Sequence, residues 1–480
     1  MAAQIKGMAT IVEKTPEGTI YRCPESYHVP SLDVLTLLFE SEHSSATEET
    51  PIHVSAANPA HLVTKFQARI LLKRAGYALR HHFVIPDGAD FALRNVKDGK
   101  DVVGQKSLDW QVITDKKELE DSLIILIYSS GTTGLPKGVK LSHANIAAEA
   151  VTALDPWKAY NRENNPDFVY RTLAHLPTAH IAGIQGYLIN PVYMGGITYW
   201  MPKFDFPQFL EYNKKYKITA FFTVPPIWLA IAKHPAVTDQ FDTLDHAVSG
   251  AAPLGKDLQL AASRKLGRGK TMITQTWGLS ETTGSITLLP NGTTDTSGSV
   301  ACLIANHTAR LVDDDGKDVE VGQPGEVLVK GPVVTNGYHN NDAANAEAFK
   351  NGWFCTGDIA VFRDGKFYIV DRKKELIKYK GLQVAPAELE ALLVNHPDIM
   401  DAAVIGVEAA GTEVPRAYVV ADEKKISAAG IEEYVKRNVA DYKRLRGGVV
   451  YLEAIPKSPS GKILRKDLRE LAKREGKAKL

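Results

Sequence analysis

The stretch that most constrains this chain is Tyr128–Lys140, which reads YSSGTTGLPKGVK. An apolar run, Leu123–Tyr128, enters it and is predicted to form a buried strand. Three glycines within eight residues let the backbone turn tightly and approach a ligand closely. After the loop, Ser142 can cap a helix beginning near Ala144. A strand, a loop of small residues and a helix in this order predict a site for nucleotide phosphates.

The loop carries the groups that phosphate oxygens need. Hydroxyls and exposed N–H groups suit these oxygens, and one lysine supplies positive charge. The expected contacts are Ser129, Ser130, Gly131, Thr132, Thr133, Gly134 and Lys137. A Walker A loop ends in Gly-Lys-Ser/Thr, which this loop does not. A bare Gly/Ser/Thr run is more often a surface loop, but these thirteen residues resemble the phosphate loop of the adenylate-forming superfamily. That superfamily includes acyl- and aryl-CoA synthetases, luciferases and peptide-synthetase adenylation domains.

The composition bounds the class of protein. The chain has 480 residues, which suits more than one domain, and its 44% apolar content supports large cores. The net charge of +1 gives no indication of a nucleic-acid partner. Cys23, Cys302 and Cys355 are widely separated, which fits a reducing compartment and argues against a disulfide framework or zinc site. No apolar run approaches transmembrane length and no signal-peptide core is visible, so we expect no membrane span.

Alternation of apolar runs with helical stretches, from residue 123 to about 355, predicts βαβ units and a mostly parallel sheet. The predicted strands are Ile124–Ile127, Ala220–Val224, His246–Ser249 and Met272–Thr274, and the predicted helices are Asn145–Ala153, Ile227–Lys233 and Lys256–Leu266. Ligands of such sheets bind at the carboxyl ends of the strands. Beyond Glu326 the strands become short, with a hairpin turn at Asp364-Gly365. A charged junction and a small segment of mixed helices and strands follow.

The predicted fold class is therefore α/β, with a large N-terminal domain (1–370) of βαβ-layered sheets plus a small β-rich part. Residues 371–374 form a hinge, and 375–480 form a small α+β domain that the resemblance implies is mobile. Helices are expected at Leu35–Phe39 and Ala68–Leu79. Compared with the superfamily, an apolar strand–helix stretch is missing near Arg80–His82, so we predict that the region before residue 123 is shortened.

Two further motifs end predicted strands and resemble nucleotide contacts of the superfamily. Gly250-Ala251-Ala252-Pro253-Leu254 is small enough for a flat ring to lie against its backbone, although such a run is as often a plain turn. Thr274–Gly284 resembles the Tyr-Gly-x-Thr-Glu motif, with Trp277 for Tyr and Ser280 for Thr. The motif implies that Trp277 stacks on adenine and that Ser280 and Glu281 hold phosphate and Mg²⁺. By themselves they would more often be a packed Trp and a solvated Glu. Gln275 and Gly278 are expected to contact the nucleotide as well.

Three motifs toward the C-terminus complete the resemblance. Gly352–Asp358 is similar to Trp-x-x-Thr-Gly-Asp, which implies that Asp358 accepts the ribose hydroxyls, with Arg372 as a second ribose or phosphate contact. Glu375–Glu390 is similar to the coumarate–CoA ligase and luciferase subgroup. In that subgroup Lys378 and Gln383 face the nucleotide in one of two conformations, with Lys374 at the hinge. Pro456–Arg465 is similar to a Gly-Lys loop that picks out Lys462 as the catalytic lysine.

Leu176–Gly183 resembles the stretch that lines the acyl pocket, with His180 at a gate-like position. A lone histidine is more often structural. The small Ala179 and Ala182 stand where family members often have aromatics, so the pocket is predicted to be roomy. The resemblance gives the expected catalytic residues as Lys462, Lys378, Glu281 and His180, and the expected acyl-pocket residues as His180, Ile181, Ala182, Gly250, Gly278 and Gly284.

The resemblance implies a ligase that uses ATP and Mg²⁺ to convert a carboxylic acid to an acyl-adenylate and then to an acyl-CoA. Two alternatives stay open: an adenylating enzyme with another acceptor, and a non-catalytic or truncated relative that only binds nucleotide. The acid is open among mid-to-long-chain fatty acids, phenylpropanoids and specialised fungal-type acids. Ala478-Lys479-Leu480 resembles the Ser-Lys-Leu peroxisomal address, so we expect an import receptor as partner and a peroxisomal location, otherwise a cytoplasmic one.

Overall fold

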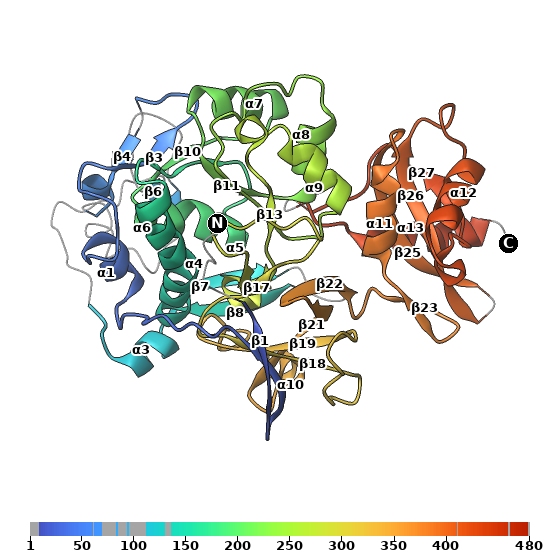
Figure 1. Ribbon diagram of the computed structural model, residues 1–480, viewed down its shortest axis with the longest axis horizontal. Coiled ribbons are helices and arrows are strands. Elements are labelled where there is room, and N and C mark those ends of the chain that lie inside the picture. Colours follow the sequence, from blue (N-terminus) through green and yellow to red (C-terminus); the bar gives the residue numbers. More distant parts are fainter. Residues whose placement is uncertain are drawn as a thin grey trace, which may run out of the picture.

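A computed structural model describes residues 9–60, 62–69, 83–84, 94–95, 112–129, 136–409, 411–458 and 461–478. Figure 1 shows a large N-terminal domain and, beside it, a smaller C-terminal domain coloured orange to red. The predicted α/β class with two domains is therefore confirmed. Most of the helix predicted at Ala68–Leu79 and the stretch Arg80–His82 lie outside the described residues.

Two sheets with parallel strands lie at the centre of the N-terminal domain. One has the strand order β4-β3-β10-β9, in which β3, β10 and β9 are parallel. Its strands are β3 (Pro51–Ser55), β4 (Leu62–Thr64), β9 (Arg171–Ala174) and β10 (Ile197–Trp200). The other is the all-parallel order β11-β12-β13, with β11 (Ala220–Thr223), β12 (His246–Ser249) and β13 (Thr274–Gln275). The predicted βαβ organisation is present, and the last strand begins two residues later than predicted.

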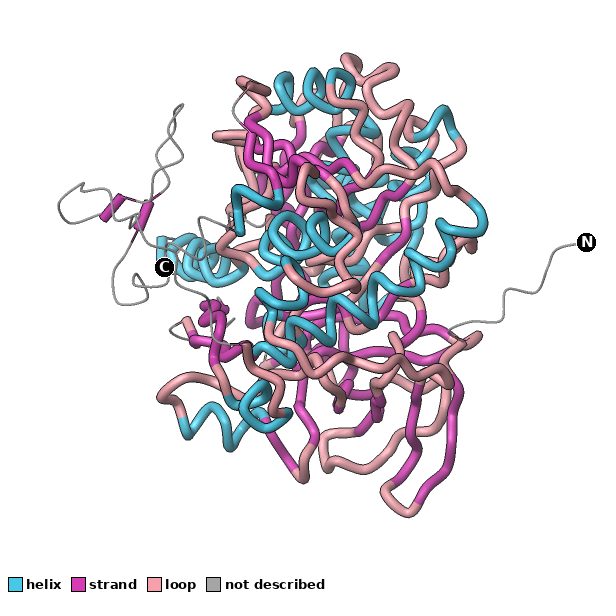
Figure 2. Tube along the Cα trace, turned by 90° about the vertical axis from the view of Figure 1, so that its left-hand side faces the viewer, coloured by secondary structure: helices cyan, strands magenta, loops and turns pink. Residues whose placement is uncertain are grey.

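Helices pack on these sheets and enclose two apolar cores. Figure 2, turned by 90°, shows the cyan helices flanking the magenta strands. The helices of this domain are α1 (Val34–Phe39), α3 (Lys116–Asp121), α4 (His143–Asn164), α5 (Ile181–Gly183), α6 (Asn190–Met194), α7 (Phe206–Lys215), α8 (Pro225–Lys233), α9 (Lys256–Ser263) and α10 (Asp342–Ala348), of which α3 contacts α4 and β8 while α10 contacts β20 and β21. One core surrounds α4, and the other packs α7, α8 and α9 against β11 and β12. A six-residue π-helix, Ile184–Ile189, lies between α5 and α6.

The stretch Tyr128–Lys140 is organised as a hairpin, which corrects the predicted order of strand, loop and helix. Strand β7 (Leu123–Ser129) pairs antiparallel with β8 (Lys137–Ser142), and only then does α4 begin. The prediction of a buried β7 was also wrong, because Leu123 and Tyr128 are exposed and only Ile127 is buried. Ile127, together with Val139 and Leu141 of β8, packs into the core around α4. The predicted helix cap is confirmed: Ser142 and Asn145 form a reciprocal capping box.

A small β-rich part follows, as predicted. The N-terminal hairpin β1 (Ile11–Thr15) and β2 (Gly18–Arg22) joins a seven-stranded sheet of order β1-β2-β18-β19-β21-β20, with β22 paired to β21. Its other strands are β18 (Thr308–Val312), β19 (Gly325–Lys330), β20 (Phe349–Lys350), β21 (Trp353–Arg363) and β22 (Lys366–Arg372). Asp364 and Gly365, between β21 and β22, both have positive φ, as the predicted tight hairpin turn requires. Shorter strand pairs are β5 (Phe83–Val84) with β6 (Arg94–Asn95), β14 (Gly278–Leu279) with β15 (Gly284–Ser285), and β16 (Thr287–Leu288) with β17 (Cys302–Leu303).

The C-terminal domain is an α+β unit with its own core. Its strands are β23 (Ile377–Tyr379), β24 (Leu382–Val384), β25 (Ile399–Ala409), β26 (Thr412–Ala421) and β27 (Val449–Tyr451), and its helices are α11 (Pro386–Asn395), α12 (Ala428–Asn438) and α13 (Arg465–Ala478). Figure 1 shows α11 facing α8 and α9 of the large domain. The Lys233 ammonium, at the end of α8, donates to the carbonyls of Val394, His396 and Ile399 at 3.2, 3.4 and 2.9 Å. Because a helix C-terminus carries partial negative charge, this contact holds the two domains together.

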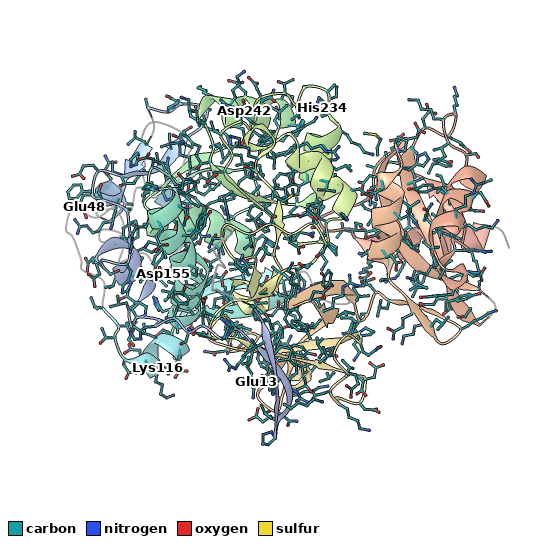
Figure 3. All side chains as sticks on the ribbon, in the orientation of Figure 1. Glu13, Glu48, Lys116, Asp155, His234 and Asp242 are labelled. Carbon is teal, nitrogen blue, oxygen red and sulfur yellow. The ribbon has the colours of Figure 1, made fainter. Side chains whose placement is uncertain are left out.

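Charged side chains of both signs are spread over the periphery, where Figure 3 labels Glu48, Lys116 and Asp242. This distribution agrees with the net charge of +1. Within the described part of the chain, none of the helices combines the length and the apolar character needed to cross a bilayer.

Candidate active site

A cavity of about 450 Å³ opens between the two domains and gathers twelve of the predicted site residues. It takes residues from the ends of β7, β11, β12 and β13, from α4 and α5, and from the C-terminal domain. The predicted residues that line it are Ser129, His180, Ile181, Ala182, Gly250, Ala251, Gly278, Ser280, Glu281, Gly284, Arg372 and Lys462. Segments more than 300 residues apart in the sequence therefore form one site, at the carboxyl ends of parallel strands.

Glu281 is the buried carboxylate of the cavity wall. Its side chain is 8% exposed, and its Oε1 accepts a hydrogen bond of 3.0 Å from the Tyr338 hydroxyl. The Lys137 ammonium lies 4.9 Å from the centre of the Tyr338 ring. Tyr338 therefore contacts both the Lys137 ammonium and the Glu281 carboxylate. Lys137 itself does not line the cavity. Tyr338 was missed by the sequence analysis, because no motif that we used extends to it.

Lys462 reaches the cavity from the C-terminal domain, and its carbonyl accepts a hydrogen bond of 2.8 Å from the Ser458 N–H. Burial, and after it the nearby Arg372 guanidinium, lower the pKa of its ammonium to about 8, while Asp358 and Glu375 oppose the shift. The lysine therefore holds a proton at neutral pH in a site with little water. Gly461 allows the turn, with a φ of +81° and Val224 of the large domain 3.2 Å from where a Cβ would lie.

His180 belongs to the large domain, where it is the N-cap residue of α5, and it lines the cavity. Its Nδ1 accepts a hydrogen bond of 3.2 Å from the Ala182 N–H. Burial lowers the pKa of the imidazole, and the positive charge of Lys462 lowers it further. A neutral ring whose Nδ1 accepts must hold its proton on Nε2. His180 is thus a donor at Nε2, and it lines the same cavity as Lys462.

Asp358 lies in strand β21, and its carboxylate contacts two donor side chains. Its Oδ2 accepts from the Trp277 indole N–H at 2.8 Å, and its Oδ1 lies 3.2 Å from Nε of Arg372. Arg372 is opposite Asp358 in the β21–β22 register and lines the cavity. The two residues predicted to bind ribose are therefore neighbours, and Asp358 stays an acceptor, as hydroxyl binding needs.

Trp277 differs from the expected stacking residue. Its side chain is 8% exposed and belongs to the core around α4, and it is not part of the cavity wall. An indole is larger than the phenol of the family motif and has an N–H that needs a partner when buried. The Asp358 carboxylate satisfies that N–H, so in this structure the ring positions Asp358.

The glycines of the two strand-end motifs are required by close packing. A Cβ at Gly278 would lie 1.7 Å from the Gly284 carbonyl oxygen, and one at Gly250 would lie 2.5 Å from the Phe222 ring. Gln275 is buried, and its amide is bonded to the backbone N–H and carbonyl of Leu254. Gln275 and Ala252 do not line the cavity. Gln275 therefore braces the turn after β12 that carries Gly250 and Ala251.

The remaining predicted residues lie elsewhere. Lys378 and Gln383 face each other across the β23–β24 hairpin, where both side chains are exposed, and neither lines the cavity. Lys374, at the predicted hinge, is exposed and pairs with Glu347 at 3.3 Å. Ser130, Gly131, Thr132, Thr133 and Gly134, and Lys479 and Leu480 of the predicted peroxisomal address, fall outside the described residues, so their roles stay predictions.

The family models match both domains of the chain. The model described as AMP-binding enzyme matches residues 53–339, and the model of the AMP-binding enzyme C-terminal domain matches residues 388–462. The chain therefore belongs to the AMP-binding enzyme family, the adenylate-forming enzymes that its motifs resemble.

Individual relatives give the comparison detail. One relative, from Emericella nidulans, is named as an acyl-coenzyme A synthetase. Its sequence is 41% identical to this chain in an alignment that covers 94% of this chain and 98% of the relative. That alignment has 546 positions, more than the 480 residues of this chain, so the relative contains segments without a counterpart here. The 4-coumarate–CoA ligase 1 of Solanum tuberosum is 42% identical over 75% of this chain and 67% of its own.

Solved structures resemble the fold. The o-succinylbenzoate CoA synthetase of Bacillus subtilis, in complex with its acyl-adenylate intermediate, superposes with a TM-score of 0.64 at 28% identity. The match covers 76% of this chain and 72% of that one. The same synthetase is also known in complex with ATP and a magnesium ion.

Proposed function

We propose that this protein is an ATP-dependent carboxylic acid–CoA ligase that works through an acyl-adenylate. The observation that carries the proposal is one cavity that is lined by Lys462, Arg372, Glu281 and His180. Apolar side chains of α4, Ala153, Leu154 and Trp157, line the same cavity. Cations and a metal-binding carboxylate suit a triphosphate, and an apolar pocket suits the body of an acid. Membership of the AMP-binding family and relatives named as acyl-CoA synthetase and 4-coumarate–CoA ligase support the same reaction.

The first half-reaction joins two anions. A carboxylate oxygen of the acid attacks the α-phosphorus of ATP, and the bond from that phosphorus to the pyrophosphate oxygen breaks. Lys462 and Arg372 offset the negative charge that develops around the phosphorus. The Nε2–H of His180 is placed to donate to the acid's oxygens, which orients the carboxylate for attack.

Glu281 fits a magnesium site that is completed by substrate. Mg²⁺ is commonly held by one or two protein carboxylates together with phosphate oxygens. Among the described residues no group of three or more His, Cys, Asp or Glu side chains could hold a metal by itself. Glu281 keeps Oε2 for a metal while Tyr338 bonds Oε1. When bound, the ion would supply charge to the pyrophosphate leaving group.

The second half-reaction transfers the acyl group to the CoA thiol, with AMP as the leaving group. The exposed pair Lys378 and Gln383 has no role in the arrangement described here. We propose that the C-terminal domain turns about residues 371–374 so that the β23–β24 hairpin replaces Lys462 at the cavity. Asp371 supports a hinge at this place, because its Oδ2 accepts from the Ala387 N–H at the start of α11 and so couples the hinge to that helix.

The test is pyrophosphate release with ATP, Mg²⁺ and a panel of carboxylic acids, each measured with and without CoA. We expect acid-dependent release that CoA stimulates. Release at the same rate with and without CoA would indicate that the acyl group is transferred from the adenylate to another acceptor. Bound ATP without release for any acid would identify a non-catalytic nucleotide-binding protein; adding back a full-length N-terminal segment would then show whether shortening before residue 123 is the cause.

A further inference from the structure

An ion pair inside the C-terminal domain lies close to Lys462 in the sequence. Nη2 of Arg465 donates to both carboxylate oxygens of Glu390, at 2.7 and 2.8 Å, and each side chain is only 13% exposed. Glu390 ends the motif 375–390 and lies on α11, whereas Arg465 ends the motif 456–465 and begins α13. Neither residue lines the cavity. The pair therefore joins the two motifs of the small domain at a place outside the cavity.

The pair also binds the backbone of strand β25. Glu390 Oε1 accepts from the Val404 N–H at 2.8 Å, and Arg465 Nε donates to the Val404 carbonyl at 3.4 Å. Both polar groups of this fully buried backbone residue are thus bonded to the two side chains. A buried ion pair is stable only when further hydrogen bonds satisfy its remaining donors and acceptors, and Val404 provides them. The start of α13 is therefore fixed on both α11 and β25.

The segment that carries Lys462 is anchored on both sides. Lys457, five residues before it, pairs with Asp401 of β25 at 2.5 Å, and Arg465 follows three residues after it. Lys457 and Ile463 form an antiparallel β-bridge, which draws the two sides of the segment together. Because both anchors hold the segment to the same strand, the place of the Lys462 ammonium in the cavity depends on them.

Acidic side chains at the predicted hinge and next to it attract the same guanidinium. Arg465 is attracted by Asp371 and Glu375 as well as by Glu390. Burial raises the pKa of the Asp371 carboxyl, and the positive charge of Arg465 opposes that rise. Arg469, one turn further along α13, pairs with Glu375. The first two turns of α13 are therefore held to the hinge region as well as to α11, which ties their position to that of the large domain.

We propose that Arg465 and Glu390 are positioning residues for the adenylation step, because their ion pair sets where the Lys462 ammonium lies in the cavity. This inference rests on the proposed ligase function, in which Lys462 offsets the charge that develops around the phosphorus. A displacement of about 1 Å near a reacting centre can cost about a hundredfold in rate. The pair therefore matters for the half-reaction that uses Lys462 and has no part in thioester formation.

The test removes both charges at once, because removing one partner would leave the other charge buried and endanger the fold. The double variant Arg465→Met with Glu390→Met largely keeps the side-chain volume, and such replacements of buried ion pairs are often neutral for stability. We expect pyrophosphate release with ATP, Mg²⁺ and an acid to slow by about ten- to a hundredfold. Thioester formation from supplied acyl-adenylate and the midpoint of thermal unfolding should stay as in the unchanged chain.

A third substitution assigns the lost rate to Lys462. If the pair acts through this lysine, adding Lys462→Ala to the double variant should give the rate of Lys462→Ala alone, because one interaction cannot be lost twice. The matched control is Arg416→Met with Glu475→Met, which removes a pair of 3.2 Å that attaches the far end of α13 to β26. This control should leave the rates of both half-reactions unchanged.

Competitive labelling of lysines with acetic anhydride, read by mass spectrometry, measures the pKa of the Lys462 ammonium without ATP or turnover. The unchanged chain should give about 8. Arg465→Lys keeps the positive charge, but one ammonium cannot take the place of the two guanidinium nitrogens that bind Glu390 and Val404. In this variant Lys462 should leave its buried place, and its pKa should rise toward the ordinary 10.5. Arg465→Lys also gives the kinetic test if the double variant does not fold.

Several results would overturn the positioning role. They are unchanged pyrophosphate release in the double variant, equal slowing of both half-reactions, a triple variant slower than Lys462→Ala, or a Lys462 pKa that stays near 8 in Arg465→Lys. Absence of pyrophosphate release from the unchanged chain with every acid would defeat the ligase function alone. The labelling would then still decide whether the ion pair sets the place of Lys462.

Discussion

Two regions of the C-terminal domain carry the predicted lysines, and the structure treats them in opposite ways. Lys462 lies in the cavity, where burial and the Arg372 guanidinium lower the pKa of its ammonium to about 8. The β23–β24 hairpin leaves Lys378 and Gln383 exposed. Both regions carry motifs that resemble those of the family in sequence. Under the proposed function, the difference means that one small domain has two working faces, and that its position decides which of them acts.

The largest effects are expected when each of the two lysines is substituted in turn. Lys462→Ala should slow pyrophosphate release by about 10²–10³, the usual cost of losing one preorganised charge at the reacting centre. It should leave thioester formation from supplied acyl-adenylate unchanged. Lys378→Ala should do the reverse. The two half-reactions are measured separately, by pyrophosphate release and by acyl-CoA formation.

A variant that slows both half-reactions alike would contradict two separate working faces. Lys270→Ala, an exposed lysine of the large domain away from the cavity, is the control and should leave both rates as they are. Thermal unfolding of all variants checks that a lost rate is not a lost fold.

The buried Lys462 ammonium should also make pyrophosphate release depend on pH. The Lys462 pKa of about 8 lies below the ordinary 10.5, so the charged form is complete at pH 7 and is lost as the pH rises through 8. Because kcat/KM reports the free enzyme, kcat/KM for ATP in pyrophosphate release should fall above pH 8, approaching tenfold per pH unit. Below about pH 7 this lysine should cause no loss.

Lys462→Arg tests the assignment, since a guanidinium stays charged throughout this range. Whatever its absolute rate, its profile should be flat from pH 7.5 to 9.5. A fall that persists in Lys462→Arg would place the titrating group elsewhere.

Much of this site could be predicted from sequence, because the motif residues lie on turns at strand ends whose local chemistry is distinctive. The hairpin at Asp364-Gly365 and the helix cap at Ser142 followed from residue type alone. Strand β8 was missed, because Pro136 and Gly138 indicate a loop while pairing with β7 decides the outcome. Tertiary contacts override such local signals.

Residues that became important only through distant contacts could not be predicted. Arg465 is one of several bases in α13, and its partner Glu390 is 75 positions away. Lys233 follows the pattern of a solvated lysine at a helix end, yet its carbonyl partners lie 161 to 166 positions away. No spacing within either helix distinguishes these residues from ordinary surface or core positions.

The smallest effect concerns the contact that holds Lys462 in place. Lys233 is the cross-domain donor to the end of α11, and its ammonium is partly exposed, so we expect it to stabilise the docked arrangement by about 1 kcal/mol. Lys233→Met keeps the apolar stem and removes the charge. It should lower pyrophosphate release about fivefold and leave thioester formation from supplied acyl-adenylate unchanged or faster, because it favours release of the domain. An equal fall in both half-reactions would mean that Lys233 serves the fold of α8 and not the choice between the two faces.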